Sequence, residues 1–240
     1  MRNKKRMKLE GILLLKKYGL PHLPFFVLKP QKVEEQIKFF MNEQNLSLIL
    51  IRTIEKNNEM FAPSIVDANL DKNLPDIKRF LNKGYKVIIS HPGNTLFNTH
   101  NINIVRLGSE ITIEAVGPGF IAPDLNRNGY IHERLLVKLK PTFEIERQFL
   151  VSDENYQKDC FKKLKQKDEE LVRAKKGYLL KFKHYPPLSQ TEISYCLKCL
   201  SILDKISNDL GYSNYVVSMG FVNMDGKGEE PYFWDIYGIS

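Results

Sequence analysis

The stretch IEAVGPGFIAPDLNRNGY, residues 113–130, joins an apolar, β-branched run to two closely spaced glycines and then to a segment rich in Pro, Asn and Gly. Residues 117–122 fit the pattern G-x-G-x-x-A, which in dinucleotide-binding proteins holds a pyrophosphate at the start of a helix. Pro123 and Gly129 lie where that helix would have to continue, and no β-α-β unit surrounds the motif. The sequence therefore does not predict a dinucleotide site here, and the glycines taken alone predict a turn.

Length and composition indicate an ordinary globular chain. The 240 residues predict one large domain or one domain built of two lobes, and the 42% hydrophobic and 27% charged residues are typical of a globular protein. No apolar run approaches the roughly 20 residues that span a bilayer, and the basic N-terminus lacks a signal-peptide cleavage site, so we expect a cytoplasmic protein without a membrane partner. The net charge of +8 favours an anionic partner such as a nucleotide. The basic clusters are not interleaved with aromatic residues, so nucleic-acid binding is possible but not favoured.

The three cysteines do not predict a metal or disulfide framework. Cys196 and Cys199 have the spacing of a zinc knuckle, but they lie inside an apolar-periodic helical segment and no second Cys/His pair accompanies them. We expect these two thiols and Cys160 to be free and buried or half-buried.

Periodicity predicts a mixture of helices and antiparallel strands. The expected helices cover residues 8–20, 31–45, 74–85, 153–175 and 189–210. The expected strands cover residues 46–53, 86–90, 101–107, 110–117, 132–140, 143–150, 177–185, 215–224 and 231–238. Short turns between several strand pairs require hairpins, so the predicted fold class is α+β with mostly antiparallel sheets.

Four stretches, taken in chain order, resemble a known nucleotide-binding domain. They are KLEGILLLKKYGLPHLPFFVL (8–28), LILIRTIEKN (48–57), the stretch 113–130 and PYFWDIYG (231–238). Together they resemble the ATP-grasp-like N-terminal domain of phosphoenolpyruvate synthase and pyruvate phosphate dikinase. The resemblance places Lys8 at the family lysine, Arg52 at the arginine that reaches the triphosphate, Glu114 in the family's I-E-A strand and Asp235 at a metal- or phosphate-facing glutamine.

This resemblance implies an ATP-grasp-like fold with lobes near residues 1–106 and 107–240 that clamp ATP with Mg²⁺. It implies that Lys8 and Arg52 bind phosphates, that Glu114 and Asp235 hold Mg²⁺, and that Arg52 and Glu114 act in catalysis. The implied reaction is phosphoryl transfer, or activation of a carboxylate for ligation, with an unidentified small-molecule acceptor.

One departure from the family keeps a second function open. Ser218, Met219 and Gly220 stand where the family carries a metal-binding glutamate. A degenerate ATP-grasp fold that binds a nucleotide, or serves as an interaction module without catalysis, is therefore the alternative.

Each proposed site residue also has a structural alternative. Lys8 could be one more solvated charge of the basic N-terminus, and Arg52 could make an ion pair that only stabilises its strand. Glu114 could point to solvent from a half-buried sheet, and Asp235 could lie on the outer face of the last strand.

Overall fold

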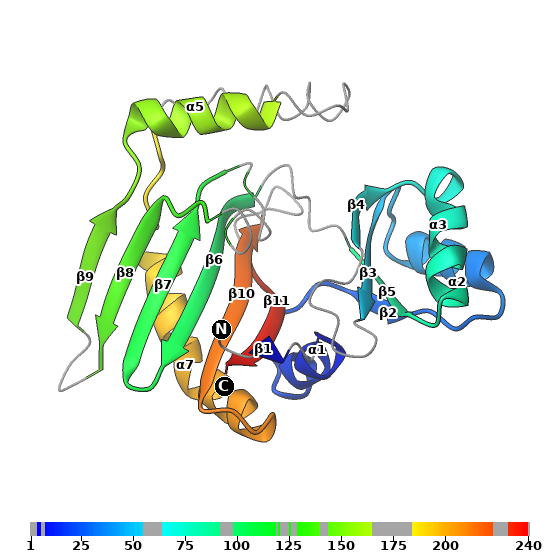
Figure 1. Ribbon diagram of the computed structural model, residues 1–240, viewed down its shortest axis with the longest axis horizontal. Coiled ribbons are helices and arrows are strands. Elements are labelled where there is room, and N and C mark those ends of the chain that lie inside the picture. Colours follow the sequence, from blue (N-terminus) through cyan, green and yellow to red (C-terminus); the bar gives the residue numbers. More distant parts are fainter. Residues whose placement is uncertain are drawn as a thin grey trace. The chain divides into compact units, whose positions relative to one another are not determined.

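The computed structural model describes residues 4–5, 8–54, 64–91, 98–118, 120, 125, 129–139, 144–164, 184–222 and 230–239 (Figure 1). It divides into two compact units. Unit 1 combines Met1–His22 with Asn94–Ser240, and unit 2 is Leu23–Gly93, inserted between them.

Unit 1 is built on a seven-stranded sheet with the order β1-β11-β10-β6-β7-β8-β9, and every neighbouring pair is antiparallel. Its strands are β1 (Lys4–Lys5), β6 (Asn98–Leu107), β7 (Glu110–Val116), β8 (Glu133–Lys138), β9 (Glu144–Phe149), β10 (Asn214–Val222) and β11 (Glu230–Ile239). Successive side chains in a strand point to opposite faces, so each strand contributes alternate residues to each face.

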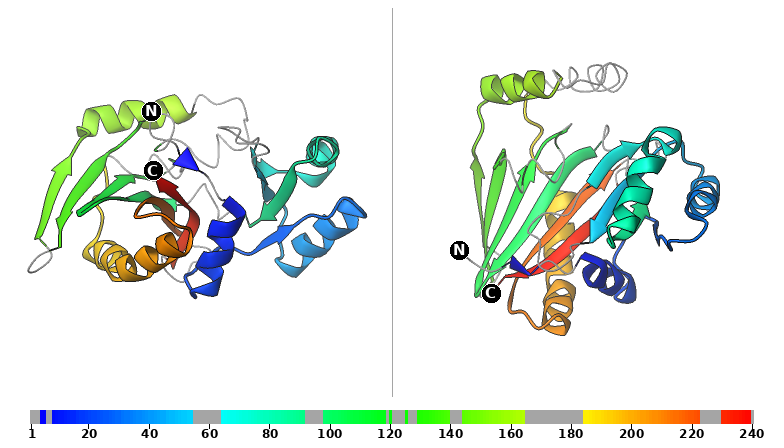
Figure 2. Two further views of the ribbon diagram at one scale, coloured as in Figure 1. Left: turned by 60° about the horizontal axis from the view of Figure 1, so that its bottom comes forward. Right: turned by 45° about the vertical axis from the view of Figure 1, so that its right-hand side comes forward.

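Two helices cover one face of this sheet, as Figure 2 shows: α1 (Lys8–Lys17) and α7 (Gln190–Asp209). α7 begins with a capping box, in which the Ser189 side chain accepts from the Glu192 amide and the Glu192 side chain accepts from the Ser189 amide. The apolar stripe of α7, including Cys196 and Leu203, packs on alternate sheet residues such as Ile104. A third helix, α5 (Asp153–Leu164), packs in a separate aromatic cluster at the end of the sheet where β7 ends.

Unit 2 is a four-stranded antiparallel sheet with the order β2-β5-β3-β4. Its strands are β2 (Phe25–Val27), β3 (Ile49–Ile54), β4 (Ser64–Ala68) and β5 (Lys86–Ser90), and its helices are α2 (Val33–Glu43) and α3 (Leu70–Asn82). Ile37 and Phe40 of α2 and Ile77 of α3 pack on Ile49 and Ile51 of β3, so both helices lie on one face of the sheet.

The expected α+β class with mostly antiparallel sheets is confirmed. The expected division into lobes near residue 106 falls between β6 and β7, which are paired neighbours inside unit 1. The compact units therefore divide the chain elsewhere, because the whole of unit 2 is an insertion before β6. The expected strand at 177–185 and the second half of the expected helix at 153–175 fall largely outside the described residues.

No helix in the part of the chain that the structure describes is long and apolar enough to cross a membrane.

Candidate functional site

Five polar residues form a row across the large sheet of unit 1. Asp235 lies opposite Ser218, Ser218 opposite Asn103, Asn103 opposite Glu114, and Glu114 opposite Arg134. Their neighbours along the strands pack under α1 and α7, so strand alternation puts all five on the other face. We call these five residues the polar row.

The row changes character from one end to the other. At its centre Ser218 and Asn103 are 2% and 4% exposed, and the Ser218 hydroxyl donates to Asn103 Oδ1 at 2.8 Å. Towards β8, Arg134 Nη2 and Nε both donate to Glu114 Oε1, at 2.9 and 3.2 Å, and the two side chains are 34% and 19% exposed. The row thus runs from a buried hydroxyl–amide pair to a partly exposed ion pair.

The two carboxylates of the row are too far apart to share one small cation. Glu114 and Asp235 are three strands apart, about 14 Å at the usual strand spacing of about 4.8 Å. Mg²⁺ binds its oxygen ligands at about 2.1 Å. Each carboxylate would therefore serve a separate cation or a different part of a bound anion. In the described ranges no three His, Cys, Asp or Glu residues are grouped as a metal site would require.

Trp234, the only tryptophan of the chain, lies beside the row. The register of β11 against β10 shifts between the pairs Ser218–Asp235 and Met219–Phe233, which leaves Trp234 as the extra residue of a β-bulge. A Cβ atom at Gly220 would be 3.1 Å from the indole Nε1, so glycine lets the half-buried indole lie against β10. Trp234 is thus a natural reporter of events at Asp235.

The glycine that begins the stretch G-P-G serves close packing. The amide of Gly117 donates to His132 Nδ1 at 3.1 Å, and a Cβ at this position would be 2.9 Å from the Tyr156 hydroxyl oxygen and 3.0 Å from the Tyr185 ring. Phe120 and these aromatic side chains form edge-on contacts around the turn. Close packing at the turn therefore explains why residue 117 is a glycine. Gly119 lies outside the described residues.

The sequence-predicted residues fall into two groups. Glu114 and Asp235 lie on the polar row of unit 1. Lys8 is the first residue of α1 in the same unit, but its side chain lies outside the described part. Arg52 belongs to unit 2, where it is half-buried on β3 opposite Ile88. The alternation of β3 puts Arg52 on the face away from α2 and α3.

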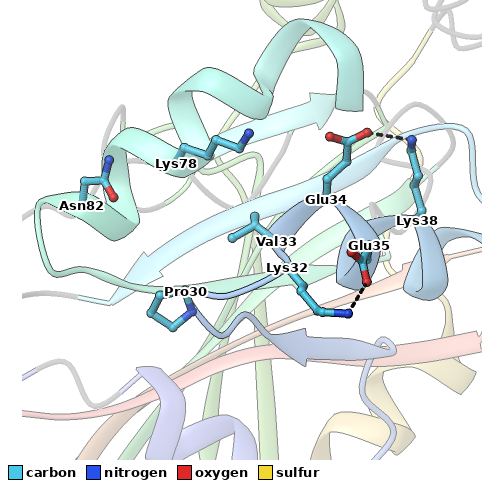
Figure 3. A pocket seen from close by; sticks show the side chains of 8 residues that line it. All are labelled: Pro30, Lys32, Val33, Glu34, Glu35, Lys38, Lys78 and Asn82. Carbon is cyan, nitrogen blue, oxygen red and sulfur yellow. Dashed lines mark hydrogen bonds and ion pairs between the residues drawn. The ribbon is translucent and has the colours of Figure 1, made fainter.

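A hollow of about 540 Å³ lies on the helix side of unit 2 (Figure 3). It is lined by Pro30, Lys32, Val33, Glu34, Glu35, Lys38, Lys78 and Asn82. Lys38 pairs with Glu34 at 2.7 Å and Lys32 with Glu35 at 3.2 Å, and the hydrogen bond from Lys38 lowers the pKa of Glu34. Since these charges compensate one another and none of the predicted residues lines the hollow, it is not the predicted site.

A second polar cluster is buried on the helix-covered face of unit 1. His100 Nδ1 is 2.7 Å from Glu192 Oε1, and His100 Nε2 is 2.7 Å from the carbonyl oxygen of Pro186. Glu133, fully buried, pairs with Arg147 at 2.5 Å and accepts from the Leu188 amide at 2.9 Å. These bonds attach the segment before α7 to the sheet, which is a structural role.

Titration of this cluster is coupled. Burial by itself would lower the pKa of His100, but the hydrogen bond and charge of Glu192 outweigh it and raise that pKa. Burial by itself would raise the pKa of Glu192, but His100 outweighs it and lowers that pKa. Burial, together with the charge of Glu133, also raises the pKa of Tyr185 well above its usual range. Both His100 and Glu192 are therefore stabilised in their charged forms.

Comparisons with known proteins give similarity in structure only. No protein-family model matches the chain, and no curated protein matches it. One similar solved structure is ACD1 of Ca. Korarchaeum cryptofilum in complex with coenzyme A, with 14% identity, a TM-score of 0.48, and coverage of 99% of this chain and 93% of that one.

Two further similar structures contain a bound peptide. The macrocyclase MdnC of Microcystis aeruginosa MRC, bound with the precursor peptide MdnA, shows 12% identity, a TM-score of 0.43, and coverage of 95% of this chain and 50% of that one. A RiPP-associated ATP-grasp ligase of Chryseobacterium gregarium, in complex with ADP and a leader and core peptide, shows 11% identity and a TM-score of 0.42. The match covers 94% of this chain and 49% of that one. The chain spans about half the length of these two enzymes. Every one of these TM-scores is below 0.5, so these likenesses carry no conclusion about function.

Sequence reasoning did not predict three members of the polar row as site residues: Asn103, Ser218 and Arg134. The signal was present for Asn103, because the segment NINIV alternates polar and β-branched residues and so assigns its asparagines to one face. For Arg134 the pairing with Glu114 depends on β7 and β8 being neighbours. The 16 residues between these strands are too many for the tight hairpin turn that would have predicted this pairing.

Proposed function

We propose that this chain is an ATP-grasp-like protein that binds ATP together with Mg²⁺, with the polar row as the surface that faces the metal and the phosphates. The observation that carries the proposal is the composition of that row. Carboxylate, hydroxyl and amide oxygens are the ligand types that Mg²⁺ prefers, and a guanidinium suits phosphate oxygens. All of them lie on the face of the large sheet opposite α1 and α7, where Ser218 and Asn103 are buried and Glu114 and Arg134 are partly exposed.

The proposed roles follow the chemistry of each residue. Asp235, beside the Ser218–Asn103 pair, is the proposed ligand of Mg²⁺. Glu114 orients Arg134 through two hydrogen bonds to one carboxylate oxygen, which leaves its other oxygen for a second cation. Lys8 and Arg52 are proposed to neutralise the triphosphate, as the resemblance implies.

The proposed chemistry is phosphoryl transfer to, or ATP-dependent ligation of, a small-molecule acceptor. In either reaction the protein contributes mainly positioning and charge neutralisation. A specific observation favours a second candidate function, nucleotide binding without turnover. β10 carries Ser218 and Gly220 on the face of the row, where the resemblance expects a metal-binding carboxylate. One carboxylate near the buried centre of the row is a weak basis for metal-assisted chemistry.

Isothermal titration calorimetry with ATP, in the presence and absence of Mg²⁺, tests the proposal. We expect binding that requires Mg²⁺ and weakens at least tenfold in Asp235→Asn and in Arg52→Ala. Arg79→Ala is the matched control, because Arg79 is an exposed arginine of unit 2 that pairs with Asp76 in the preceding turn of α3. Absence of binding at millimolar ATP, or equal effects of Arg52→Ala and Arg79→Ala, would contradict the proposal.

Turnover separates the two candidate functions. Release of ADP or phosphate by the wild-type protein, lost in Asp235→Asn, supports an enzyme. Mg²⁺-dependent binding without ATP consumption, in the presence of a mixture of carboxylic acids and amines, supports the non-catalytic alternative.

A further inference from the structure

Residues 184–189, which we call the strap, lead into α7 and belong to no helix or strand. The strap contains two consecutive prolines, which have no amide hydrogen, so it depends largely on side chains of other elements for its attachment. One point of attachment is Leu188, whose amide donates to Glu133 at 2.9 Å and whose carbonyl accepts from Arg147 at 2.7 Å. These bonds fix the end of the strap that joins α7.

Two buried carboxylates organise the attachment, and each is paired with one cation. Glu133 Oε1 is 2.5 Å from Arg147 Nε. Glu192, which caps α7 together with Ser189, is 2.7 Å from His100. An arginine stays charged throughout the physiological pH range, whereas a histidine can lose its charge near neutrality. The strap therefore depends on one permanent and one removable cation.

Both ring nitrogens of His100 face an acceptor. Nδ1 is 2.7 Å from Glu192 Oε1, and Nε2 is 2.7 Å from the carbonyl oxygen of Pro186 in the strap. Because a neutral imidazole carries only one N–H, only the imidazolium can donate to both acceptors. Loss of the proton to solvent removes one of the two hydrogen bonds and leaves a buried acceptor unsatisfied, which is unfavourable.

We infer that the charged form of His100 holds the strap in place, and that loss of its proton frees the strap at Pro186. The Leu188 end stays attached, because Arg147 keeps its charge. The release affects Tyr185 most directly, because its ring lies edge-on to His100, with centroids 5.9 Å apart, and packs in the aromatic cluster at the end of β7. The strap is thus a pH-dependent element at that end of the large sheet.

The direction of the pH dependence follows from the surroundings of His100. Burial by itself lowers the pKa of His100, but the hydrogen bond and charge of Glu192 and smaller contributions from the Pro186 carbonyl and Glu133 outweigh it, and the pKa is raised above 6.5. The attached form is therefore complete below pH 6.5 and is lost as the pH rises through the folded-state pKa. We expect an attached strap in mildly acidic solution and a released one in alkaline solution.

Rising pH acts on this region through His100. Burial raises the pKa of the Tyr185 hydroxyl well above its usual range, and burial also raises the pKa of the Cys196 thiol. His132 accepts from the Gly117 amide through Nδ1, so this nitrogen has no proton to lose. Among the described residues, the charged and titratable groups on the surrounding elements are Glu192 and Cys196 on α7, Tyr185 on the strap, Glu133 on β8, His132 just before β8, and Arg147 on β9.

Nitrogen NMR of the histidine rings tests the charge of His100 in the wild-type protein. We expect both of its ring nitrogens to be protonated at about pH 6, and one of them to lose its proton with a midpoint above that of an ordinary histidine. A ring nitrogen of His100 without a proton at about pH 6, or an imidazolium that persists up to about pH 10, would overturn the inference.

A nuclear Overhauser effect between Tyr185 and Gly117 tests the release of the strap. A Cβ at Gly117 would be 3.0 Å from the Tyr185 ring, so the ring and the glycine α-hydrogens are close in the attached form. This signal should be lost as the pH passes the midpoint measured for His100, while the Leu188 amide stays protected from hydrogen exchange. A signal that persists across that midpoint would overturn the inference.

Two histidine variants assign the release to one side chain. In His100→Gln the signal between Tyr185 and Gly117 should already be weak in mildly acidic solution and should not depend on pH. His184→Gln is the matched control, because His184 belongs to the strap, lies 2.7 Å from Asp153 and is 73% exposed, and this variant should behave like the wild type. A pH-dependent loss of the signal in folded His100→Gln would overturn the inference. If His100→Gln does not fold, the titration of the wild type decides.

Discussion

Removal of the buried histidine in the His100→Ala variant should destabilise unit 1 strongly. The His100 and Glu192 side chains are both 4% exposed and lie 2.7 Å apart. Loss of one partner of a buried ion pair leaves the other charge without compensation, which costs about 3–5 kcal/mol of unfolding free energy. The same change also removes the hydrogen bond between the imidazole and the Pro186 carbonyl.

An exposed pair of the same kind supplies the matched control. His184 Nδ1 is also 2.7 Å from a carboxylate oxygen, that of Asp153, but these side chains are 73% and 57% exposed. Solvent screening limits such a pair to about 0–1 kcal/mol, so His184→Ala should be nearly neutral. Urea unfolding followed by Trp234 fluorescence measures both variants, because all of these residues belong to unit 1. Equal losses in the two variants would refute the assignment of the large effect to burial.

The advantage of the wild type over His100→Ala should also depend on pH. The pKa of His100 is raised above its ordinary value of 6.5, so its contribution is complete below pH 6.5 and is lost as the pH rises through the folded-state pKa. The pKa of Glu192 is lowered below its ordinary value of 4.5, so its contribution is complete above pH 4.5 and is lost as the pH falls through the folded-state pKa. The difference should therefore be largest between pH 4.5 and 6.5 and should shrink in alkaline solution. A difference that grows above pH 8 would contradict this linkage.

Three further predictions concern single features. Gly117→Ala should lower the unfolding free energy by about 1–3 kcal/mol, since its Cβ would meet the Tyr156 hydroxyl at 2.9 Å, and an unchanged melting temperature would count against the packing role. Glu114→Gln should change the unfolding free energy by only about 0–1 kcal/mol, because the ion pair of Glu114 with Arg134 is partly exposed. Urea unfolding measures this change. A loss above about 2 kcal/mol would indicate that Glu114 stabilises the fold rather than binds a ligand. The three cysteines are buried, and burial raises the pKa of each thiol, to about 11 for Cys160. Ellman's reagent should therefore react with these thiols only after unfolding. Rapid reaction of the native protein would show that a thiol is accessible.

The strongest local signals in the sequence predicted their elements well. The helix expected at 189–210 is α7, because Ser189 and Glu192 form a capping box ahead of an apolar-periodic run. The last two strands form a hairpin as expected. The free, buried state of the cysteines is confirmed, because the spacing of Cys196 and Cys199 places both on the core-facing stripe of α7.

The start of α3 and the whole of β4 were not predicted correctly, because the local sequence signals for them are weak. The helix expected at 74–85 starts four residues too late. α3 begins at Leu70 instead, because Asn69 caps it by accepting from the Lys72 amide. β4 was not expected at all, and its pairing with β3 is a tertiary preference that a five-residue segment does not reveal.

The candidate site could be predicted only in part. Strand alternation assigns Glu114 and Asp235 each to one face of its strand, but the sequence does not give the strand order that aligns them with Ser218 and Asn103. That order depends on β6 pairing with β10, which lies more than 100 residues later in the chain, in addition to its hairpin partner β7. Long-range pairings of this kind are decided by the packing of the whole sheet.

The central claim is that ATP with Mg²⁺ lies on the polar row, and the emission of Trp234 tests it most directly. This single tryptophan is the residue before Asp235 and lies against Gly220 of β10. Addition of ATP should change its fluorescence in a saturable manner, and only when Mg²⁺ is present. ATP that binds by calorimetry but leaves the emission unchanged, or Mg²⁺-dependent binding that persists undiminished in Asp235→Asn, would show that the nucleotide lies elsewhere and would contradict the claim.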